Sequence, residues 1–312
     1  PYALSVESSS GGFRKFSNIL AGEVWLCSGQ SNMEWALSKT DNAAEDIASA
    51  ANTNIRLFTQ TRNGTEQEAE DVLNGSWKVC SPETVASFSG VGYLFGRELA
   101  QDLDVPVGLL YAAYGGARIE CFISEEALAD SPLVHRLSYE AAGDHNRDAT
   151  HLYNGMIAPL IPYTIKGAIW YQGCANATAE LHSEYLEAQK LMIQDWRERW
   201  GMEFPVLITQ LAAYGRVGYS EYFPYVREAQ WKLTHALEGV EMAVVLETGE
   251  ENNIHPTDKA TVGHRLALAA KGAVYGMDTA YRYPEPSGLT VTDLDAVVTF
   301  NHTSVSYTHL TL

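Results

Sequence analysis

The stretch "GEVWLCSGQSNMEW", residues 22–35, joins an apolar run to a polar turn. Val24 to Ser28 have the character of a buried β-strand, and Gly29-Gln30-Ser31-Asn32 follow at once. A strand that ends in a glycine turn commonly leads into a helix. The turn places Ser31 between two side-chain amides, so it is either an ordinary polar turn residue or a nucleophile with hydrogen-bond donors beside it.

Four further apolar runs resemble this first strand, which we expect over residues 23–28. They cover residues 105–113, 165–171, 206–211 and 242–246. Because none alternates strictly between apolar and polar residues, both faces of each strand are expected to be covered.

Apolar residues recur at steps of three and four in three intervening segments, which predicts helices. These segments are 181–196 with Gly201 as its stop, 222–237, and 262–273 with Thr257 or Asp258 as its N-cap. Strands that alternate with helices predict an α/β fold in which helices cover both faces of a parallel sheet.

Composition excludes several classes of function. The chain has 312 residues, of which 46% are hydrophobic, and its net charge is −18. Such an acidic chain is not expected to bind nucleic acid or an anionic membrane surface, and it has no run of 18 apolar residues that would insert into a bilayer.

Cysteine and histidine spacing argues against a metal site. Cys27, Cys80, Cys121 and Cys174 form no C-x-x-C pair, and the nine histidines show no zinc-binding spacing. We interpret the cysteines as buried free thiols, with disulfides left open, and expect no cofactor.

Ligands of open parallel sheets bind at the carboxyl ends of the strands, which is where Ser31 lies. The pattern is not G-x-S-x-G, since Met33 stands two residues after Ser31. A serine in such a turn still needs an imidazole to take its proton. His255 follows the last strand run and precedes a helix, so it is the candidate base.

A tetrahedral intermediate also needs hydrogen-bond donors. The candidates are the backbone N–H of Ser31, the Gly115-Gly116 turn and the side-chain amide of Asn176. Glycine lets the backbone approach a substrate closely, and an amide donates a hydrogen bond without a titrating charge.

Six separated blocks give the chain a resemblance to a known family. "GEVWLCSGQSNMEW", "VPVGLLYAAYGGARIE", "LYNGMIAPLIP", "KGAIWYQGCANA", "FPYVREAQ" and "IHPTDKATVGHRLAL" occur in this order. Over residues 17–276 they resemble the sialate O-acetylesterases of the SGNH (GDSL-type) hydrolase superfamily.

The resemblance implies a three-layer α/β/α fold and a carboxylic ester hydrolase that acts on acetylated carbohydrate. It implies Ser31 as nucleophile, His255 as base, and Gly116, Gly115 and Asn176 as oxyanion donors. Gln30 and Gln172 are interpreted as supporting residues. The resemblance also implies a secreted or periplasmic protein, and the oligomeric state is left open.

Two of the blocks depart from the family pattern. The family's W-Y-Q-G-E-S-N-A block has Cys174 and Ala175 in place of its glutamate and serine, and its D-I-H-P block has Asn253 in place of the aspartate. The acid that would orient His255 is therefore missing. Glu250 or Glu251 can replace it, or a backbone carbonyl can orient the imidazole in a Ser31–His255 dyad.

The resemblance also suggests a division of the chain. Residues 1–16 are expected to end an N-terminal β-rich region, 17–280 to form the esterase domain, and 281–312 to begin a C-terminal β-rich region whose last residues are non-native. Two alternatives to a sialate esterase remain: an acetylesterase acting on xylan or another neutral glycan, which the net charge of −18 favours, and a catalytically impaired carbohydrate-binding homologue.

Overall fold

A seven-stranded sheet forms the centre of the protein. The computed structural model describes residues 1–137, 147–293 and 295–303. The strands lie in the order β5-β4-β6-β3-β7-β8-β9, and all neighbours are parallel except β4 and β5. Their bounds are β3 (Glu23–Gly29), β4 (Asn52–Thr59), β5 (Ser76–Cys80), β6 (Val107–Ala113), β7 (Gly167–Tyr171), β8 (Val206–Thr209) and β9 (Val240–Ala243).

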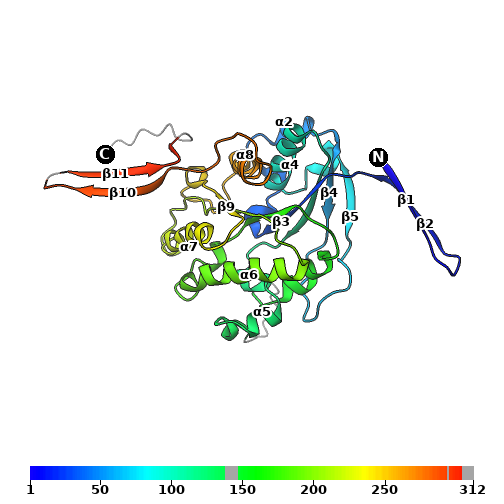
Figure 1. Ribbon diagram of the computed structural model, residues 1–312, viewed down its shortest axis with the longest axis horizontal. Helices are drawn as coiled ribbons and strands as arrows, with labels where there is room; N and C mark the ends of the chain where they lie inside the picture. Colours follow the sequence, from blue (N-terminus) through cyan, green and yellow to red (C-terminus); the bar gives the residue numbers. More distant parts are fainter. Residues whose placement is uncertain (138–146, 294, 304–312) are drawn as a thin grey trace.

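Helices cover both faces of this sheet, which confirms the predicted three-layer α/β fold. On one face lie α2 (Ala43–Ala48), α4 (Gly90–Leu103) and α8 (Lys259–Ala269) (Figure 1). On the other lie α5 (Glu125–Ala129), α6 (Tyr185–Trp200) and α7 (Phe223–Ala236). Two one-turn helices, α1 (Ser31–Glu34) and α3 (Pro82–Val85), and short 3₁₀ turns such as η6 (Cys174–Asn176) and η8 (Leu246–Thr248) complete the connections.

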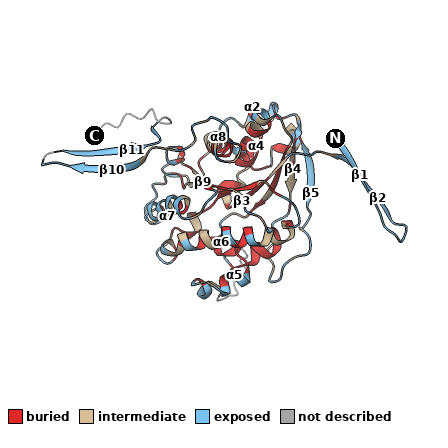
Figure 2. Cartoon of the chain, in the orientation of Figure 1, coloured by how far each residue is buried: buried red, intermediate tan, exposed pale blue. Residues whose placement is uncertain are grey.

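The core consists of large aromatic side chains on both sides of the sheet. Trp25 of β3 meets Phe95 of α4 edge-to-face at 5.1 Å between ring centroids. Trp170 of β7 meets Trp196 of α6 in the same way at 5.7 Å. All three tryptophans are fully buried, and Figure 2 shows the central strands and the helix faces against them as buried. This packing explains why the strand sequences are apolar on both faces.

The predicted elements and the observed ones agree in type, with differences at their ends. The last strand was expected at 242–246, but β9 covers Val240–Ala243 and the turn η8 follows it. Helix α6 ends at Gly201 with φ of +63°, and the cap of α8 is Asp258, whose Oδ1 accepts the Thr261 N–H at 2.9 Å. The sequence patterns did not predict β4, β5 or α4.

Two antiparallel hairpins lie outside the sheet. They are β1 (Tyr2–Glu7) with β2 (Phe13–Ile19), and β10 (Glu285–Val291) with β11 (Ala296–Asn301). They project on opposite sides of the α/β core and are largely exposed (Figures 1 and 2). Strand β2 crosses the expected boundary at residue 16, and the division of the chain remains a prediction. Residues 304–312, expected to be non-native, lie outside the described residues.

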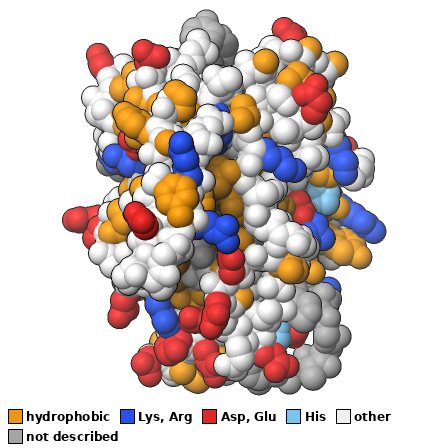
Figure 3. All heavy atoms as spheres, turned by 90° about the vertical axis from the view of Figure 1, so that its right-hand side faces the viewer, with side chains coloured by type: hydrophobic (Ala, Val, Ile, Leu, Met, Phe, Trp, Pro, Cys, Tyr) orange, Lys and Arg blue, Asp and Glu red, His pale blue; other side chains and the backbone are white. Residues whose placement is uncertain are grey.

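The membrane, charge and cysteine predictions made from the composition can be compared with the structure. Among the described residues, no helix is long and apolar enough to cross a bilayer. On the face drawn in Figure 3, the Lys and Arg side chains stand apart among acidic and apolar ones. The four cysteines are free thiols, as expected, and three of them are buried.

The register of the three central strands brings their carboxyl ends to one level. Gly29 at the end of β3 pairs with Ala113 of β6 and with Tyr171 of β7. The turn that carries Ser31 therefore lies between the turns that follow β6 and β7. Gly29 has φ of +134°, and a Cβ there would lie 2.2 Å from the carbonyl oxygen of Tyr171. Only glycine fits this position.

We therefore expect Gly29→Ala to destabilise the fold by roughly 3 kcal/mol, since it adds a steric clash to a backbone conformation that alanine disfavours. The measurement is the urea midpoint of unfolding. The control is Gly12→Ala, where the new Cβ would meet only the Ser8 Cβ, at an ordinary 3.6 Å. Equal midpoints for the two variants would contradict the proposed constraint.

Candidate active site

Ser31 and His255 meet at the carboxyl end of the sheet. The Oγ of Ser31, the first residue of α1, lies 2.8 Å from Nε2 of His255 in the loop before α8. Both residues are partly buried, and 224 positions separate them in the sequence. This distance suits transfer of the hydroxyl proton to the imidazole.

Asn253 fixes the backbone of His255. Its Oδ1 accepts the His255 N–H at 3.0 Å, and its Nδ2 donates to the His255 carbonyl at 2.8 Å. Glu250 braces the same loop, because its carboxylate accepts the Thr257 N–H at 2.8 Å and the Asn253 Nδ2 at 3.1 Å. These bonds lower the pKa of Glu250.

Within the described residues, neither candidate acid forms a hydrogen bond to His255. Glu250 uses its carboxylate on the loop, and Glu251 is exposed. The described residues also provide no hydrogen-bond partner for Nδ1 of His255.

An indole stacks on the imidazole. The rings of Trp35 and His255 are 5.1 Å apart at an interplanar angle of 20°. Trp35 is itself fixed, because its Nε1 donates to the Lys39 carbonyl at 2.9 Å. Burial lowers the pKa of His255, and the positive charge of Lys259 lowers it further. His255 is thus held in one plane and favoured in its neutral, proton-accepting form.

The candidate oxyanion donors lie on the neighbouring turns. A Cβ on Gly115 would stand 3.6 Å from the Ser31 Cβ, so this backbone adjoins the nucleophile. Gly116 follows with φ of +74°. Asn176 is buried: its Oδ1 accepts the Ile119 N–H at 3.0 Å, and its Nδ2 donates to Glu120 at 2.9 Å. Among the described residues the second amide hydrogen of Asn176 has no acceptor, and no hydrogen bond joins Asn176 to Ser31.

The two glutamines support these turns from within the protein. Gln30 is buried, and its Oε1 accepts the Gly173 N–H at 2.9 Å. Gln172 is fully buried and donates from Nε2 to the Ala117 carbonyl at 3.0 Å and to Asn176 Oδ1 at 2.7 Å. Both therefore hold the β7 turn against its neighbours.

The sequence analysis missed Asn32 and Lys259. The Nδ2 of Asn32 donates to the Ile254 carbonyl at 3.0 Å, which joins the residue after Ser31 to the residue before His255. The Oδ1 of Asn32 accepts a hydrogen bond from the buried Lys259 Nζ at 2.7 Å. Both residues lie inside the blocks quoted above, Asn32 next to Ser31 and Lys259 four residues after His255. This proximity in the sequence could have indicated that they belong to the site.

The sequence analysis also missed a charged group at the edge of the site. Arg62, in the loop after β4, donates from Nε to the Glu34 carboxylate at 2.7 Å, and its guanidinium lies 4.9 Å from the Tyr114 ring centroid. Its Nη2 would stand 3.6 Å from a Cβ on Gly115. The side chain of Arg62 is 50% exposed, so a ligand beside Ser31 can reach it. Since β4 was not predicted, its terminal loop was not considered.

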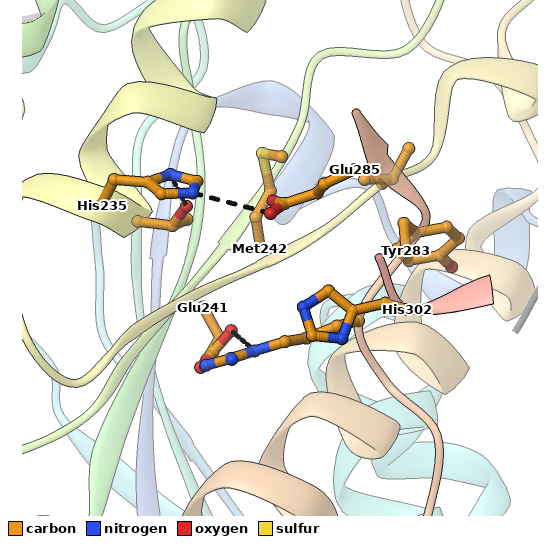
Figure 4. A pocket seen from close by; sticks show the side chains of 9 residues that line it. His235, Glu241, Met242, Tyr283, Glu285 and His302 are labelled. Carbon is orange, nitrogen blue, oxygen red and sulfur yellow. Dashed lines mark hydrogen bonds and ion pairs between the residues drawn. The ribbon is translucent and has the colours of Figure 1, made fainter. Parts of the chain in front are cut away.

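Another cavity lies away from these residues. It has a volume of about 140 Å³ and is formed by α7, β9 and the base of the C-terminal hairpin, with His235, Glu241 and Glu285 in its lining (Figure 4). His235 Nε2 lies 3.6 Å from Glu285 there. In the described part of the chain, no group of three or more His, Cys, Asp or Glu residues is arranged to hold a metal ion.

Curated proteins of similar sequence are sialate O-acetylesterases. The chain is 31% identical over 289 residues to human sialate O-acetylesterase and 30% identical over 315 residues to the mouse protein of that name. Each alignment covers 83% of this chain but only 54% and 58% of the respective relative. The chain thus spans about half the length of the curated relatives it matches.

Solved structures share the fold. XAC1771, a carbohydrate acetylesterase from Xanthomonas citri, superposes with a TM-score of 0.88 at 34% identity, covering 97% of this chain and 68% of that one. A protein from Arabidopsis thaliana superposes with a TM-score of 0.50 at 20% identity, covering 80% of this chain and 96% of that one, which shows similarity of fold alone.

A sequence model of a carbohydrate esterase family, described as sialic acid-specific acetylesterase, matches residues 21–271. This range contains all seven strands of the central sheet, and it includes Ser31 and His255. The chain belongs to the sialic acid-specific acetylesterase family of carbohydrate esterases.

Proposed function

We propose that this protein is a serine esterase that hydrolyses O-acetyl esters of carbohydrates, with acetylated sialic acid as its substrate. The 2.8 Å contact between Ser31 Oγ and His255 Nε2, in a chain of this family, carries the proposal. The hydrogen bond between these two candidate reacting groups also favours an active esterase over an impaired binding homologue.

The reaction begins when Ser31 Oγ attacks the acetyl carbonyl carbon and His255 takes the hydroxyl proton. The backbone N–H groups of Ser31, Gly115 and Gly116, with the remaining amide hydrogen of Asn176, stabilise the oxyanion. His255 then returns the proton to the sugar oxygen, which leaves as the alcohol. Water attacks the acetyl-serine with His255 as base, and acetate is released.

We propose that His255 works in a dyad with Ser31. The Asn253 side chain holds the backbone of His255 from both its N–H and its carbonyl, and Trp35 stacks on its ring. These contacts fix the backbone and the ring plane of His255, although they make no hydrogen bond to Nδ1, the atom that an aspartate contacts in a triad. Glu250 is a positioning residue, since it acts through Asn253 and Thr257.

The choice of an acidic sugar is supported by Arg62. A protein with a net charge of −18 repels an anion unless a local cation offsets the field. The Arg62 guanidinium lies beside Gly115. It already donates to Glu34 from Nε and Nη2, so a substrate carboxylate would meet its remaining Nη1 edge. A sialate carboxylate is the matching group. We further propose an extracytoplasmic location on the basis of the family resemblance alone.

Ser31→Ala is expected to abolish release of acetate while the fold is retained, because the hydroxyl lies at a partly exposed turn. Loss of one member of a catalytic unit costs on the order of 10⁶ in kcat. The measurements are acetate release from an acetyl ester and the circular dichroism spectrum, with Ser49→Ala on the end of α2 as control. A Ser31→Ala protein with near-normal kcat would refute the mechanism.

The pH–rate profile is expected to reflect the depressed pKa of His255. Since the base must be neutral, kcat/KM should fall only below the ordinary imidazole value of about 6.5. Asn253→Asp places a negative charge on the loop, raises the pKa of His255, and should move the acidic limb upward by roughly one pH unit. The matched control is Glu251→Gln, an exposed position of the same loop. A limb that Asn253→Asp leaves unmoved would remove position 253 from the mechanism.

Arg62→Gln is expected to raise KM for acetylated sialic acid by roughly tenfold, because a hydrogen bond to a charged group contributes about 1.5–3 kcal/mol. Hydrolysis of acetylated xylan should change little, and Arg62→Lys should keep part of the sialate preference. A wild-type protein that prefers acetylated xylan would contradict the acidic substrate and favour a neutral-glycan esterase.

A further inference from the structure

Lys259, the first residue of α8, is a buried cation without a carboxylate partner. Its side chain has no exposed surface. Within the described residues its Nζ makes one hydrogen bond, to Asn32 Oδ1, and lies 5.5 Å from the Tyr171 ring centroid. No carboxylate oxygen of the described chain lies within 4.0 Å of it, whereas buried lysines are normally paired. Burial lowers the pKa of Lys259 to about 7.

Cys174 stands where the family pattern has a glutamate. Its thiol is close enough to Lys259 to interact electrostatically with the ammonium. Burial raises the pKa of the Cys174 thiol to about 12, so the thiol is neutral and does not balance the lysine charge. A glutamate at 174 would supply the missing negative charge.

A chain of hydrogen bonds links Lys259 to both reacting residues. Lys259 donates to the Oδ1 of Asn32, which follows Ser31, and the Nδ2 of Asn32 donates to the carbonyl of Ile254, which precedes His255. The ammonium thus fixes the amide that ties the nucleophile turn to the base loop.

Charged and titratable groups surround both Lys259 and His255. Lys259 faces the Cys174 thiol from η6 and the more distant carboxylates of Asp258, Glu250 and Asp41. His255 faces Lys259 and Lys39, which disfavour its protonated form, and Glu34, which favours it. After burial, the Lys259 ammonium has the largest effect on the pKa of His255. Glu34, which has the opposite effect, is itself paired with Arg62.

We propose, on the basis of the esterase function above, that Lys259 is a positioning residue whose protonation state controls the rate. The ammonium anchors Asn32 between Ser31 and His255, and it opposes the positive charge that His255 gains when it takes the serine proton. Loss of the Lys259 proton to solvent removes this repulsion, while the neutral amine still donates a hydrogen bond to Asn32. The enzyme is therefore activated as pH rises through neutrality, and Cys174 is the residue that makes this activation possible.

The expected pH–rate profile has two rising steps. The first, on the acidic side, reports deprotonation of His255. The second, near pH 7, should raise kcat by roughly fivefold, which corresponds to about 1 kcal/mol of repulsion relieved. A fixed structural role for Lys259 would produce no second step.

The experiment compares kcat from pH 5 to 9 for the wild type, Cys174→Glu and the neutral control Cys174→Ser, with p-nitrophenyl acetate as probe. In Cys174→Glu the carboxylate balances the ammonium, so the second step should disappear and kcat below pH 7 should rise. Cys174→Ser should keep both steps. Lys259→Met should lose the second step, and Lys271→Met, which removes a lysine paired with Glu98 and Asp102 far from the site, should keep it.

Stability provides a readout that does not need activity. The pKa of Lys259 is lower in the folded protein than in the unfolded chain, so its protonated form disfavours folding. Its contribution to stability is present at high pH and is lost as pH falls toward about 7. The urea midpoint should thus rise from pH 7 to pH 9 in the wild type and in Cys174→Ser, and this rise should be smaller in Cys174→Glu.

The outcomes separate the two proposals. A wild type that hydrolyses no acetyl ester at any pH overturns the proposed function and this inference with it. An active wild type with a single step, or with a profile that Cys174→Glu reproduces unchanged, overturns the inference alone. Two steps that merge into one in Cys174→Glu, with the smaller stability change, support it.

Discussion

The close approach of Gly29 to the Tyr171 carbonyl is the constraint on which the site depends. It sets the ends of β3 and β7 at one level, and the β3–β6 pairing does the same for Ala113. The turn with Ser31 is thereby placed between the Gly115 turn and the turn after β7. Parallel strands end at the same edge of the sheet, and the loop before α8 brings His255 to Ser31 at that edge. The sheet therefore fixes the position of Ser31, and the loop before α8 positions His255.

Neutral amides, rather than ion pairs, hold that base loop in position. Asn32 reaches from the nucleophile turn to Ile254, Asn253 holds His255 by its backbone, and Gln30 fixes the turn at Gly173. An amide donates and accepts at once and has no charge that titrates, so this framework keeps its geometry over a wide range of pH. Two charged groups join this framework: the Glu250 carboxylate, which accepts from Asn253 and Thr257, and the Lys259 ammonium, which donates to Asn32. The Lys259 ammonium can lose its proton near neutral pH, whereas the amides do not titrate.

The sequence predicts the central part of this structure and misses its edge, for physical reasons. The strands that became β3, β6, β7 and β8 are apolar because Trp25 and Trp170 are packed on both sides of the sheet. In α4 the glycines hide the helical pattern, yet a Cβ at Gly96 would meet Leu109 of β6 at 2.8 Å, so the glycine is a packing requirement. Strand β4 mixes polar and apolar residues, so its sequence gives no clear strand pattern. Because β4 was not predicted, Arg62 in the loop after it was missed as well. The pairing of Ser31 with His255 followed from strand ends and the family blocks, whereas the partner of Lys259 is 227 positions away and has no local signature.

Two of the departures from the family pattern act in the same direction. Asn253 in place of aspartate and Cys174 in place of glutamate each remove a negative charge, the first from the loop of His255 and the second from the vicinity of Lys259. Both changes disfavour the imidazolium, and on electrostatic grounds both slow proton transfer at low pH. Both also make the site less negative than the rest of a protein with a net charge of −18. For a neutral sugar this brings no benefit. For an acidic sugar, as proposed above, the missing negative charges lower the repulsion that the substrate meets on approach, so the same two substitutions that weaken the base favour the binding of an anion.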